Sequence, residues 1–420
     1  MKTTSKILLT VATLLSVICV NAQNNTNSPY TRFGLGELAD YGSGRSKGMG
    51  GVSIGVRNNR GVNAANPASY TCIDSLSFIF EFGAMGKESI FTDANNNRDN
   101  DFNANLEFLT LRFPIGRWFS ASVGFIPYSY VGYSFPANGQ IITTGTTGND
   151  TISYERAYNG SGGLNQLYGG LAAKIGKHVS LGINAYYLFG TIQNTRQVTF
   201  DATYGSFYST LQDSKLKIND FNIRYGLQYY TPIKQKHFLT VGAIFEMKNR
   251  LGGKYSVETS TVDTIAEHNG SKFETPITIG GGVSYSYTNK LTVGADVLYQ
   301  GWSDAKYFGV SDSLTDRTKV SIGAEYTPDF FAKNYFKRIS YRLGATVSTG
   351  YLDIKGATIA NYGITFGLGL PARGGRSAIN IGVEYGRLGN NSYGQIREDY
   401  FKFSLSASFN EIWFFKRRFE

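Results

Sequence analysis

The sequence predicts an all-β fold: a closed antiparallel barrel of fourteen transmembrane strands with an N-terminal hatch inside its lumen. Three observations predict this fold. Apolar and polar residues alternate along many segments, the connections between these segments alternate between short and long, and the chain begins with an export signal. Glycine is frequent, at 50 of 420 residues, while proline contributes only 9. Few segments have a helical pattern, which suits a β-rich chain.

Residues 1–22 are expected to be a signal peptide that is absent from the mature protein. Two lysines precede an apolar run, and Val20-Asn21-Ala22 offers a cleavage site of the required small-residue type. The alternative is a lipoprotein signal that uses Cys19, although the residues before it fit a lipobox poorly. Only Cys72 then remains in the mature chain, so an internal disulfide is excluded.

The segment 178–189 shows the alternation that defines the strands. Its even positions begin with small or polar residues, and its odd positions are all apolar or aromatic: Val179, Leu181, Ile183, Ala185, Tyr187 and Phe189. A soluble β-sandwich also alternates in this way. However, many segments here keep the pattern for nine or more residues, about the length that a tilted membrane strand needs. We therefore expect the apolar face to contact lipid and the other face to line a lumen.

The fourteen expected strands form a barrel over residues 75–410, followed by a periplasmic tail at 411–420. Short turns, expected on the periplasmic side, alternate with mostly longer polar connections, such as 136–163 and 252–272. No mature segment has 18 consecutive apolar residues, which excludes a transmembrane helix. The strands are expected to begin near residues 75, 103, 117, 164, 178, 216, 236, 273, 290, 314, 338, 361, 376 and 397.

Aromatic residues gather near the ends of these strands, where the aromatic girdles of an outer-membrane barrel lie. The candidates for these girdles are Trp118, Tyr128, Tyr130, Tyr229, Tyr230, Tyr299, Trp302, Trp413 and Phe414.

Residues 23–74 alternate poorly and are dense in glycine, so they do not fit the strand pattern. Eight strands fill a barrel with their own side chains, whereas sixteen leave an aqueous channel. A fourteen-stranded lumen lies between these cases and needs a plug. Residues 23–74 are the only sizeable segment left to supply one, and we predict that they form the hatch.

Several motifs, in their order along the chain, resemble the FadL/TodX-type outer-membrane transporters of hydrophobic compounds, in the form common among Bacteroidota. The matching segments are "SPYTRFGLGEL" (28–38), "GMGGVSIG" (48–55), "NPASY" (66–70), "VGFIPYSYVGY" (123–133), "LYQGWSD" (298–304) and "FNEIWFFKRRF" (409–419). The resemblance implies fourteen strands around a hatch that carries an Asn-Pro-Ala motif, matched here by Asn66, Pro67 and Ala68. It also implies a kink in the third strand that opens a lateral exit through the wall.

Pro127 lies in the third expected strand and is the candidate for this kink. Proline cannot donate a hydrogen bond to a β-ladder, so within a sheet it marks an edge, a bulge or a break. A proline tolerated near a strand end is the alternative. For Asn66-Pro67, the alternative to a hatch element is an ordinary Asx turn before proline.

Glycines recur on the lumen face of nine expected strands, each about four to seven residues from a short turn. They would form a belt around the periplasmic half of the wall. Glycine weakens a strand unless another group must approach closely, so we predict that the hatch packs against this belt. The alternative is that the glycines make space for tyrosines on adjacent strands. The belt consists of Gly124, Gly182, Gly226, Gly242, Gly294, Gly323, Gly344, Gly367 and Gly382.

Charged residues also fall on the expected lumen face. They either pair with one another across a wet interior or bind the carboxylate of an acidic lipid, and the sequence does not choose between these roles. The residues are Glu81, Lys174, Arg224, Glu246, Asp296, Lys319, Glu325, Arg342 and Glu384.

Catalytic and cofactor functions find no support in the sequence. The three histidines have no partner at metal-ligand spacing, no Ser-His arrangement is visible, and the glycines of 48–55 lack the GK[ST] of a phosphate loop. We therefore expect no enzyme, no metal and no cofactor. The mature chain keeps a net charge of +8 after loss of two lysines from +10, but nucleic acid is not an expected partner of an exported protein.

The resemblance implies passive uptake of small hydrophobic molecules, such as long-chain fatty acids, across a bacterial outer membrane, with exit sideways into its lipid. Ligands would meet an apolar pocket above the hatch. One alternative is a scaffold or shuttle subunit of a secretion machine, possessing a similar barrel and a permanently closed hatch. A polar porin is a second alternative, but the expected plug argues against it.

Overall fold

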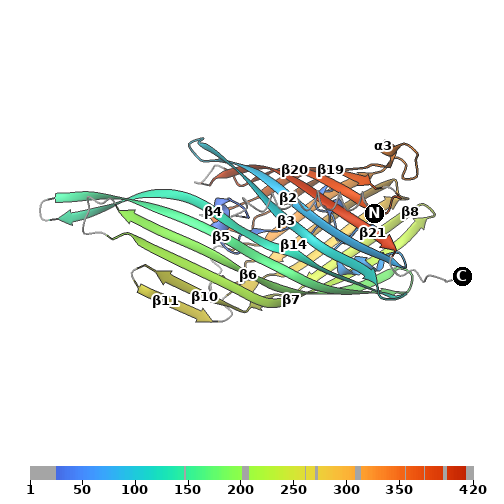
Figure 1. Ribbon diagram of the computed structural model, residues 1–420, viewed down its shortest axis with the longest axis horizontal. Helices are drawn as coiled ribbons and strands as arrows, with labels where there is room; N and C mark the ends of the chain where they lie inside the picture. Colours follow the sequence, from blue (N-terminus) through green and yellow to red (C-terminus); the bar gives the residue numbers. More distant parts are fainter. Residues whose placement is uncertain are drawn as a thin grey trace, which may run out of the picture.

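The computed structural model describes residues 25–412, apart from gaps at 146–147, 201–207, 261, 270–272, 308–313, 355, 373 and 391–394. Within these residues, fourteen antiparallel strands form one closed barrel (Figure 1). The barrel strands are β2 (Ser77–Thr92), β3 (Arg98–Pro114), β4 (Phe119–Gly145), β5 (Gly148–Ile175), β6 (Val179–Phe200), β7 (Thr210–Lys234), β8 (His237–Glu246), β13 (Ile277–Tyr287), β14 (Leu291–Gly301), β15 (Arg317–Tyr326), β16 (Ser340–Ser348), β19 (Asn361–Pro371), β20 (Ala378–Leu388) and β21 (Arg397–Ile412).

Pairing between the first and last of these strands closes the barrel. The β2–β21 ladder runs from Ser77↔Ile412 to Thr92↔Arg397, and every other barrel strand pairs with its neighbours in sequence order. The predicted fourteen-stranded barrel is thus confirmed. Strand β21 continues two residues beyond the expected barrel end at 410. The predicted signal peptide and most of the predicted tail lie outside the described residues.

The apolar faces of the strands point outward, as the alternation predicts. On β6, Leu181 is 43% exposed, whereas the neighbouring Ser180 and Asn184 are fully buried. A row of exposed apolar side chains of this kind would be unfavourable in water but suits contact with lipid. The polar faces point inward, where they meet the N-terminal segment.

The connections predicted at 136–163 and 252–272 are wrong, because much of each is β-structure. Strands β4 and β5 pair along 136–163, and β10 (Gly253–Thr259) pairs with both β7 and β11 (Val262–Asn269). In Figure 1, β4–β7, β10 and β11 extend far beyond one end of the barrel. Polar residues dominate this extension, so its sequence shows little of the apolar alternation that predicts a strand.

The predicted girdles are only partly right. Trp118, Tyr229 and Tyr299 lie exposed on the outer surface, but Trp302 is 1% exposed and sits inside. Tyr128 and Tyr130 are also buried inside. The alternation assigns each side chain to the inner or the outer face. Where it is interrupted, as around Pro127, the sequence does not show which face an aromatic residue near a strand end occupies. Trp413 and Phe414 lie outside the described residues.

The remaining elements are short. The N-terminal segment contains η1 (Pro29–Arg32), β1 (Glu37–Leu38), α2 (Gly44–Lys47) and η2 (Pro67–Thr71); the connections contain β9 (Asn249–Leu251), β12 (Phe273–Thr275), α3 (Tyr335–Arg338), β17 (Asp353–Ile354) and β18 (Ala357–Thr358). No helix among the described residues has the length and apolar character needed to cross a membrane.

Candidate functional site

The N-terminal segment, residues 25–74, lies inside the barrel and forms the candidate site together with the wall around it. We divide it into a strap (residues 25–39) and an inner region (residues 40–74). Its hydrogen bonds reach strands on all sides, from Glu81 of β2 to Asp296 of β14 and Ser408 of β21. Only a segment within the lumen can touch all these walls.

Asn66, Pro67 and Ala68 fasten the inner region to one side of the wall. Asn66 is fully buried and caps η2, because its side chain accepts a hydrogen bond from the Ala68 amide at 3.1 Å. Its side-chain amide donates to the carbonyl oxygens of Ile54 and, on β7, Leu227. Both polar atoms of the Asn66 side chain are therefore already hydrogen-bonded to other parts of the protein.

Most of the nine predicted belt glycines lie directly against the inner region. A Cβ at any of seven of them would collide with it; for instance, one at Gly294 would lie 2.8 Å from Val52, and one at Gly367 would lie 2.7 Å from Cα of Gly48. Gly382 makes only ordinary contact, and Gly124 instead faces Tyr168 on the wall. Gly124 therefore fits the alternative interpretation, in which a glycine makes space for a tyrosine on an adjacent strand. The seven are Gly182, Gly226, Gly242, Gly294, Gly323, Gly344 and Gly367.

A further close approach to the inner region, at Gly282 of β13, escaped the sequence analysis. A Cβ there would lie 2.6 Å from the amide nitrogen of Gly55. The run Gly280-Gly281-Gly282 was the available signal, but Gly281, which points the other way, meets nothing within 4 Å.

Charged lumen residues hold the inner region in place. Arg45 donates two hydrogen bonds to Glu325 of β15, at 3.0 and 2.7 Å, and Lys319 of β15 lies 2.5 Å from Asp40. The carboxylate of Asp296 accepts hydrogen bonds from successive backbone amides of residues 53–55.

Other predicted lumen charges pair with one another, as one of the two interpretations expected. Arg342 bonds Glu325 at 2.6 Å, and Arg224 pairs with Glu246. Glu384 lies 3.5 Å from Lys402 of β21, a lumen cation that was not among the predicted ones. Lys174 has no ion pair among the described residues.

The wall is interrupted beside Pro127. Strand β3 pairs with β4 only from Leu109↔Phe125 to Pro114↔Ser120, although β4 continues to Gly145. Beyond that point β3 remains paired with β2, and β4 with β5, so the two edges separate. The β4–β5 register also shifts between Pro127 and Ser129. We call the separation of these edges the wall gap.

The strap occupies the wall gap. Strand β1 pairs with β4 through Glu37↔Tyr130 and Leu38↔Ser129, and the amide of Ala39 donates to the carbonyl of Tyr128 at 2.9 Å. At its start the strap also reaches the other edge.

On that edge, the side chain of Asn105 on β3 donates to the carbonyl of Asn25 at 2.5 Å, and Asn27 bonds Asp101. Opposite them, Thr31 donates to the carbonyl of Gly132 on β4 at 2.9 Å. On the β4 edge, the strap therefore supplies backbone partners that a continuous β3–β4 ladder would have supplied, whereas on the β3 edge it is held by side chains. Sequence reasoning missed this role, since two residues of strand give no local pattern.

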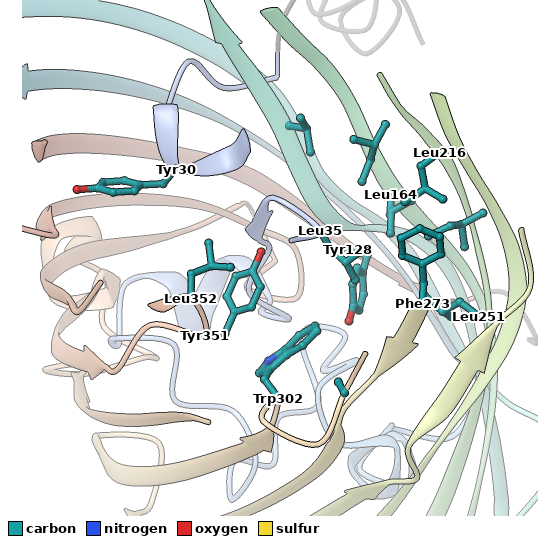
Figure 2. Packing of buried hydrophobic residues seen from close by; sticks show 14 of the residues in the cluster. Tyr30, Leu35, Tyr128, Leu164, Leu216, Leu251, Phe273, Trp302, Tyr351 and Leu352 are labelled. Carbon is teal, nitrogen blue, oxygen red and sulfur yellow. The ribbon is translucent and has the colours of Figure 1, made fainter. Parts of the chain in front are cut away.

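An aromatic cluster fills the space between the strap and the loops at the long-strand end (Figure 2). It includes Tyr30 and Leu35 from the strap, Tyr128 from β4, and Trp302 and Tyr351 from the connections, whose rings lie 4.8 Å apart between centroids. The Trp302 indole N–H has no acceptor among the described residues. Burial raises the pKa of Tyr30 to about 12, so its hydroxyl keeps its proton and donates to the carbonyl of Ile396.

The cavity next to the strap is lined by both apolar and charged residues, with Tyr130, Leu352 and Ile359 among the apolar ones. It measures about 120 Å³, and its lining includes Glu37, Lys87, Glu107, Lys319 and Lys402. Lys87 bridges Glu37 and Glu398 at 3.0 and 2.9 Å. Tyr30, Tyr351 and Leu352 belong both to this lining and to the aromatic cluster, so the cavity joins an apolar side to a charged side. Among the described residues, no group of three or more acidic, His or Cys side chains could hold a metal ion.

Solved structures share this architecture. The chain is similar to the CymD monoaromatic hydrocarbon channel, with 17% identity, a TM-score of 0.55, and 90% of this chain and 98% of that chain covered. It is similar to the Pseudomonas putida toluene transporter TodX, at 13% identity, a TM-score of 0.56, and 91% and 100% coverage. A Pseudomonas aeruginosa FadL homologue matches at 13% identity, a TM-score of 0.57, and 89% and 99% coverage. At these identities the likeness shows the fold, which confirms the FadL/TodX-like barrel.

Among curated proteins, no sequence matches this chain. A family model does: the model described as BamG matches residues 4–420, nearly the entire sequence. With that match across both the N-terminal segment and the barrel, the chain belongs to the BamG family.

Proposed function

We propose that the protein is a bacterial outer-membrane channel for small hydrophobic molecules, long-chain fatty acids or similar, that leave sideways through the wall gap. The observation that carries the proposal is the loss of β3–β4 pairing after Phe125, with only the strap between the two edges. A closed barrel gains backbone hydrogen bonds by pairing every strand fully. A wall that replaces this pairing with a separate segment can open when the segment moves.

The proposed path begins at the long-strand end and passes the aromatic cluster. Aromatic side chains there would bind apolar molecules, and the unpartnered indole N–H of Trp302 would favour a ligand with one acceptor. From the cluster, Tyr128 of β4 and Leu35 of the strap lead to the gap. Asn66, Pro67, Ala68 and the glycine belt would keep the inner region shut, so that molecules turn sideways.

A reversible crosslink tests this path. Leu38 and Ser129 are paired across β1 and β4, so cysteines at both positions, with Cys72→Ser, should form a disulfide that locks the strap. We expect uptake of a fluorescent fatty acid into cells to fall when the disulfide forms and to recover on reduction. The control is a pair at Ser286 and Thr292, which are partners within the intact wall. Uptake that continues through the locked strap would contradict the lateral exit.

A second function is supported by the many bonds between the inner region and the wall. Buried ion pairs such as Lys47–Glu107, at 3.1 Å, and Arg45–Glu325 suit a hatch that never opens. The protein would then be a scaffold or shuttle subunit, for example in a secretion machine. Under this function, the locked variant keeps its cellular role and copurifies with a stable protein partner, and fatty-acid uptake does not depend on the protein.

A further inference from the structure

The short-turn end of the barrel carries a strong positive charge. Its six turns contain eight lysines and arginines among the described residues, but a single acidic residue, Asp329. None of the eight forms an ion pair with a described carboxylate. In outer-membrane barrels this end faces the periplasm. The cations are Arg117, Lys177, Lys236, Lys290, Lys333, Lys337, Arg338 and Arg376.

A cavity of about 700 Å³ opens at the same end, between the inner region and the turns. We call it the vestibule. Its lining contains six lysines and arginines but only two carboxylates, Glu81 and Glu325. Glu325 is already shared by Arg45 and Arg342, and Glu81 accepts hydrogen bonds from backbone amides. The four remaining cations form no ion pair with a described residue; they are Arg57, Arg60, Lys177 and Arg338.

Two of these cations are held in place by aromatic rings. The Arg60 guanidinium lies 3.7 Å from the ring centroid of Phe330, and that of Arg57 lies 3.9 Å from the centroid of Tyr230. The Arg57 guanidinium also donates to Gln228 at 2.9 Å, to Thr71 at 3.0 Å and to Ser180 at 3.4 Å, so much of its donor capacity is used within the protein. Stacking fixes a guanidinium plane while leaving its N–H groups free at the edge. Arg60 has no hydrogen bond from its side chain to a described residue, so its donors are available to a ligand.

Phe330 and Arg338 come from the turn between β15 and β16, whereas Arg60 comes from the inner region. A Cβ on Gly375, in the next turn, would lie 3.2 Å from Phe330 and 3.8 Å from the Arg338 guanidinium. Three separate parts of the chain thus converge on one basic, aromatic corner of the vestibule. Charge-assisted hydrogen bonds from guanidinium groups to a carboxylate are stronger than hydrogen bonds between neutral groups.

We propose that the vestibule binds an acidic segment of a periplasmic protein. Lipid phosphates cannot be the ligand of Arg57 and Arg60, because both line the interior of the barrel. The chain's own C-terminal tail carries Lys416-Arg417-Arg418 and has the wrong charge. A single small anion would use one corner, whereas the uncompensated charge continues from the vestibule over the whole rim. Aspartates and glutamates spread along an extended segment match that distribution, and the rim would steer the segment towards the vestibule.

Binding of fluorescein-labelled hexaglutamate to the purified full-length protein in neutral detergent, followed by fluorescence anisotropy, tests the proposal. Arg60→Gln and Arg338→Gln should each weaken binding about tenfold, as expected for the loss of a charge-assisted hydrogen bond. Lys333→Gln is the matched control, because it removes the same charge from the same turn as Arg338 but outside the vestibule. It should change the affinity less than about twofold. Unchanged heat-modifiable migration will show that each variant is folded.

The opposite charge gives a second arm. Arg60→Glu should abolish hexaglutamate binding, a larger loss than that caused by Arg60→Gln, because a carboxylate in this corner repels the peptide. Equal weakening by all three glutamine variants would overturn the proposal in favour of a diffuse basic rim. Displacement of hexaglutamate by inorganic phosphate at matching concentrations would show a small-anion site instead. Binding of phosphatidylglycerol vesicles without binding of the peptide would assign the charge to lipid.

Discussion

Arg45 of the N-terminal segment and Glu325 of β15 form a two-bond ion pair across the lumen, with N–O distances of 3.0 and 2.7 Å. The same carboxylate also accepts a hydrogen bond from Arg342 on β16. One glutamate therefore neutralises two arginines from different parts of the chain. All three side chains are at most 15% exposed, so the loss of the carboxylate would leave two buried positive charges together.

Glu325→Gln should therefore destabilise the folded protein by about 3 kcal/mol, the usual cost of leaving a buried ion uncompensated. Urea unfolding in detergent measures this change. Asp399→Asn is the control, because Asp399 is also shared by two arginines, Arg387 and Arg397, but their side chains are 49% and 26% exposed. Its effect should remain below about 1 kcal/mol, as for other exposed pairs. Similar losses of stability in both variants would contradict the conclusion that Glu325 neutralises two buried arginines.

Gly182→Leu and Gly294→Leu should dislodge the inner region, because even a Cβ at these positions collides with residues 67–68 or with Val52. We expect both variants to assemble as barrels in which protease from the short-turn side cleaves within residues 40–74. Gly281→Leu is the control, since Gly281 meets nothing within 4 Å. If the inner region stays protected, or if neither leucine variant assembles, the glycines serve only wall packing.

Deletion of residues 24–70 should leave a folded but open barrel. The wall keeps all its β2–β21 and neighbouring ladders, while the lumen loses both the strap and most of the inner region. Single-channel conductance should rise well above that of the full-length protein. Equal conductance would mean that this segment does not block the lumen.

Pro127→Ala restores a backbone N–H in β4 next to the wall gap. We expect the gap to narrow, uptake of a labelled fatty acid to fall, and heat stability to hold or rise. Pro114→Ala, within the paired part of β3, is a control for the loss of a proline ring alone. Unchanged uptake would remove Pro127 from the mechanism.

Alternation and turn length, read from the sequence, determined the number of strands and the face of each that contacts lipid. Lipid on one face and a polar interior on the other impose a period of two, as in Leu181 and Ser180, and this signal is local. For the same reason it disappears outside the membrane. The pairing of β4 with β5 along residues 136–163 therefore emerged only in the structure.

Tertiary structure alone decided what the lumen residues touch. The sequence marked Glu325 and Gly323 as inward-facing, but not that Arg45 and Met49, about 280 residues earlier, would meet them. It marked Pro127 as a break, but not that Leu38 would pair beside that break with Ser129. Such contacts join segments far apart in the chain, and their partners follow from barrel closure, which brings strand faces together around a shared axis. The local sequence determines which side of the wall a residue faces. The closed fold determines which residue it contacts on that side.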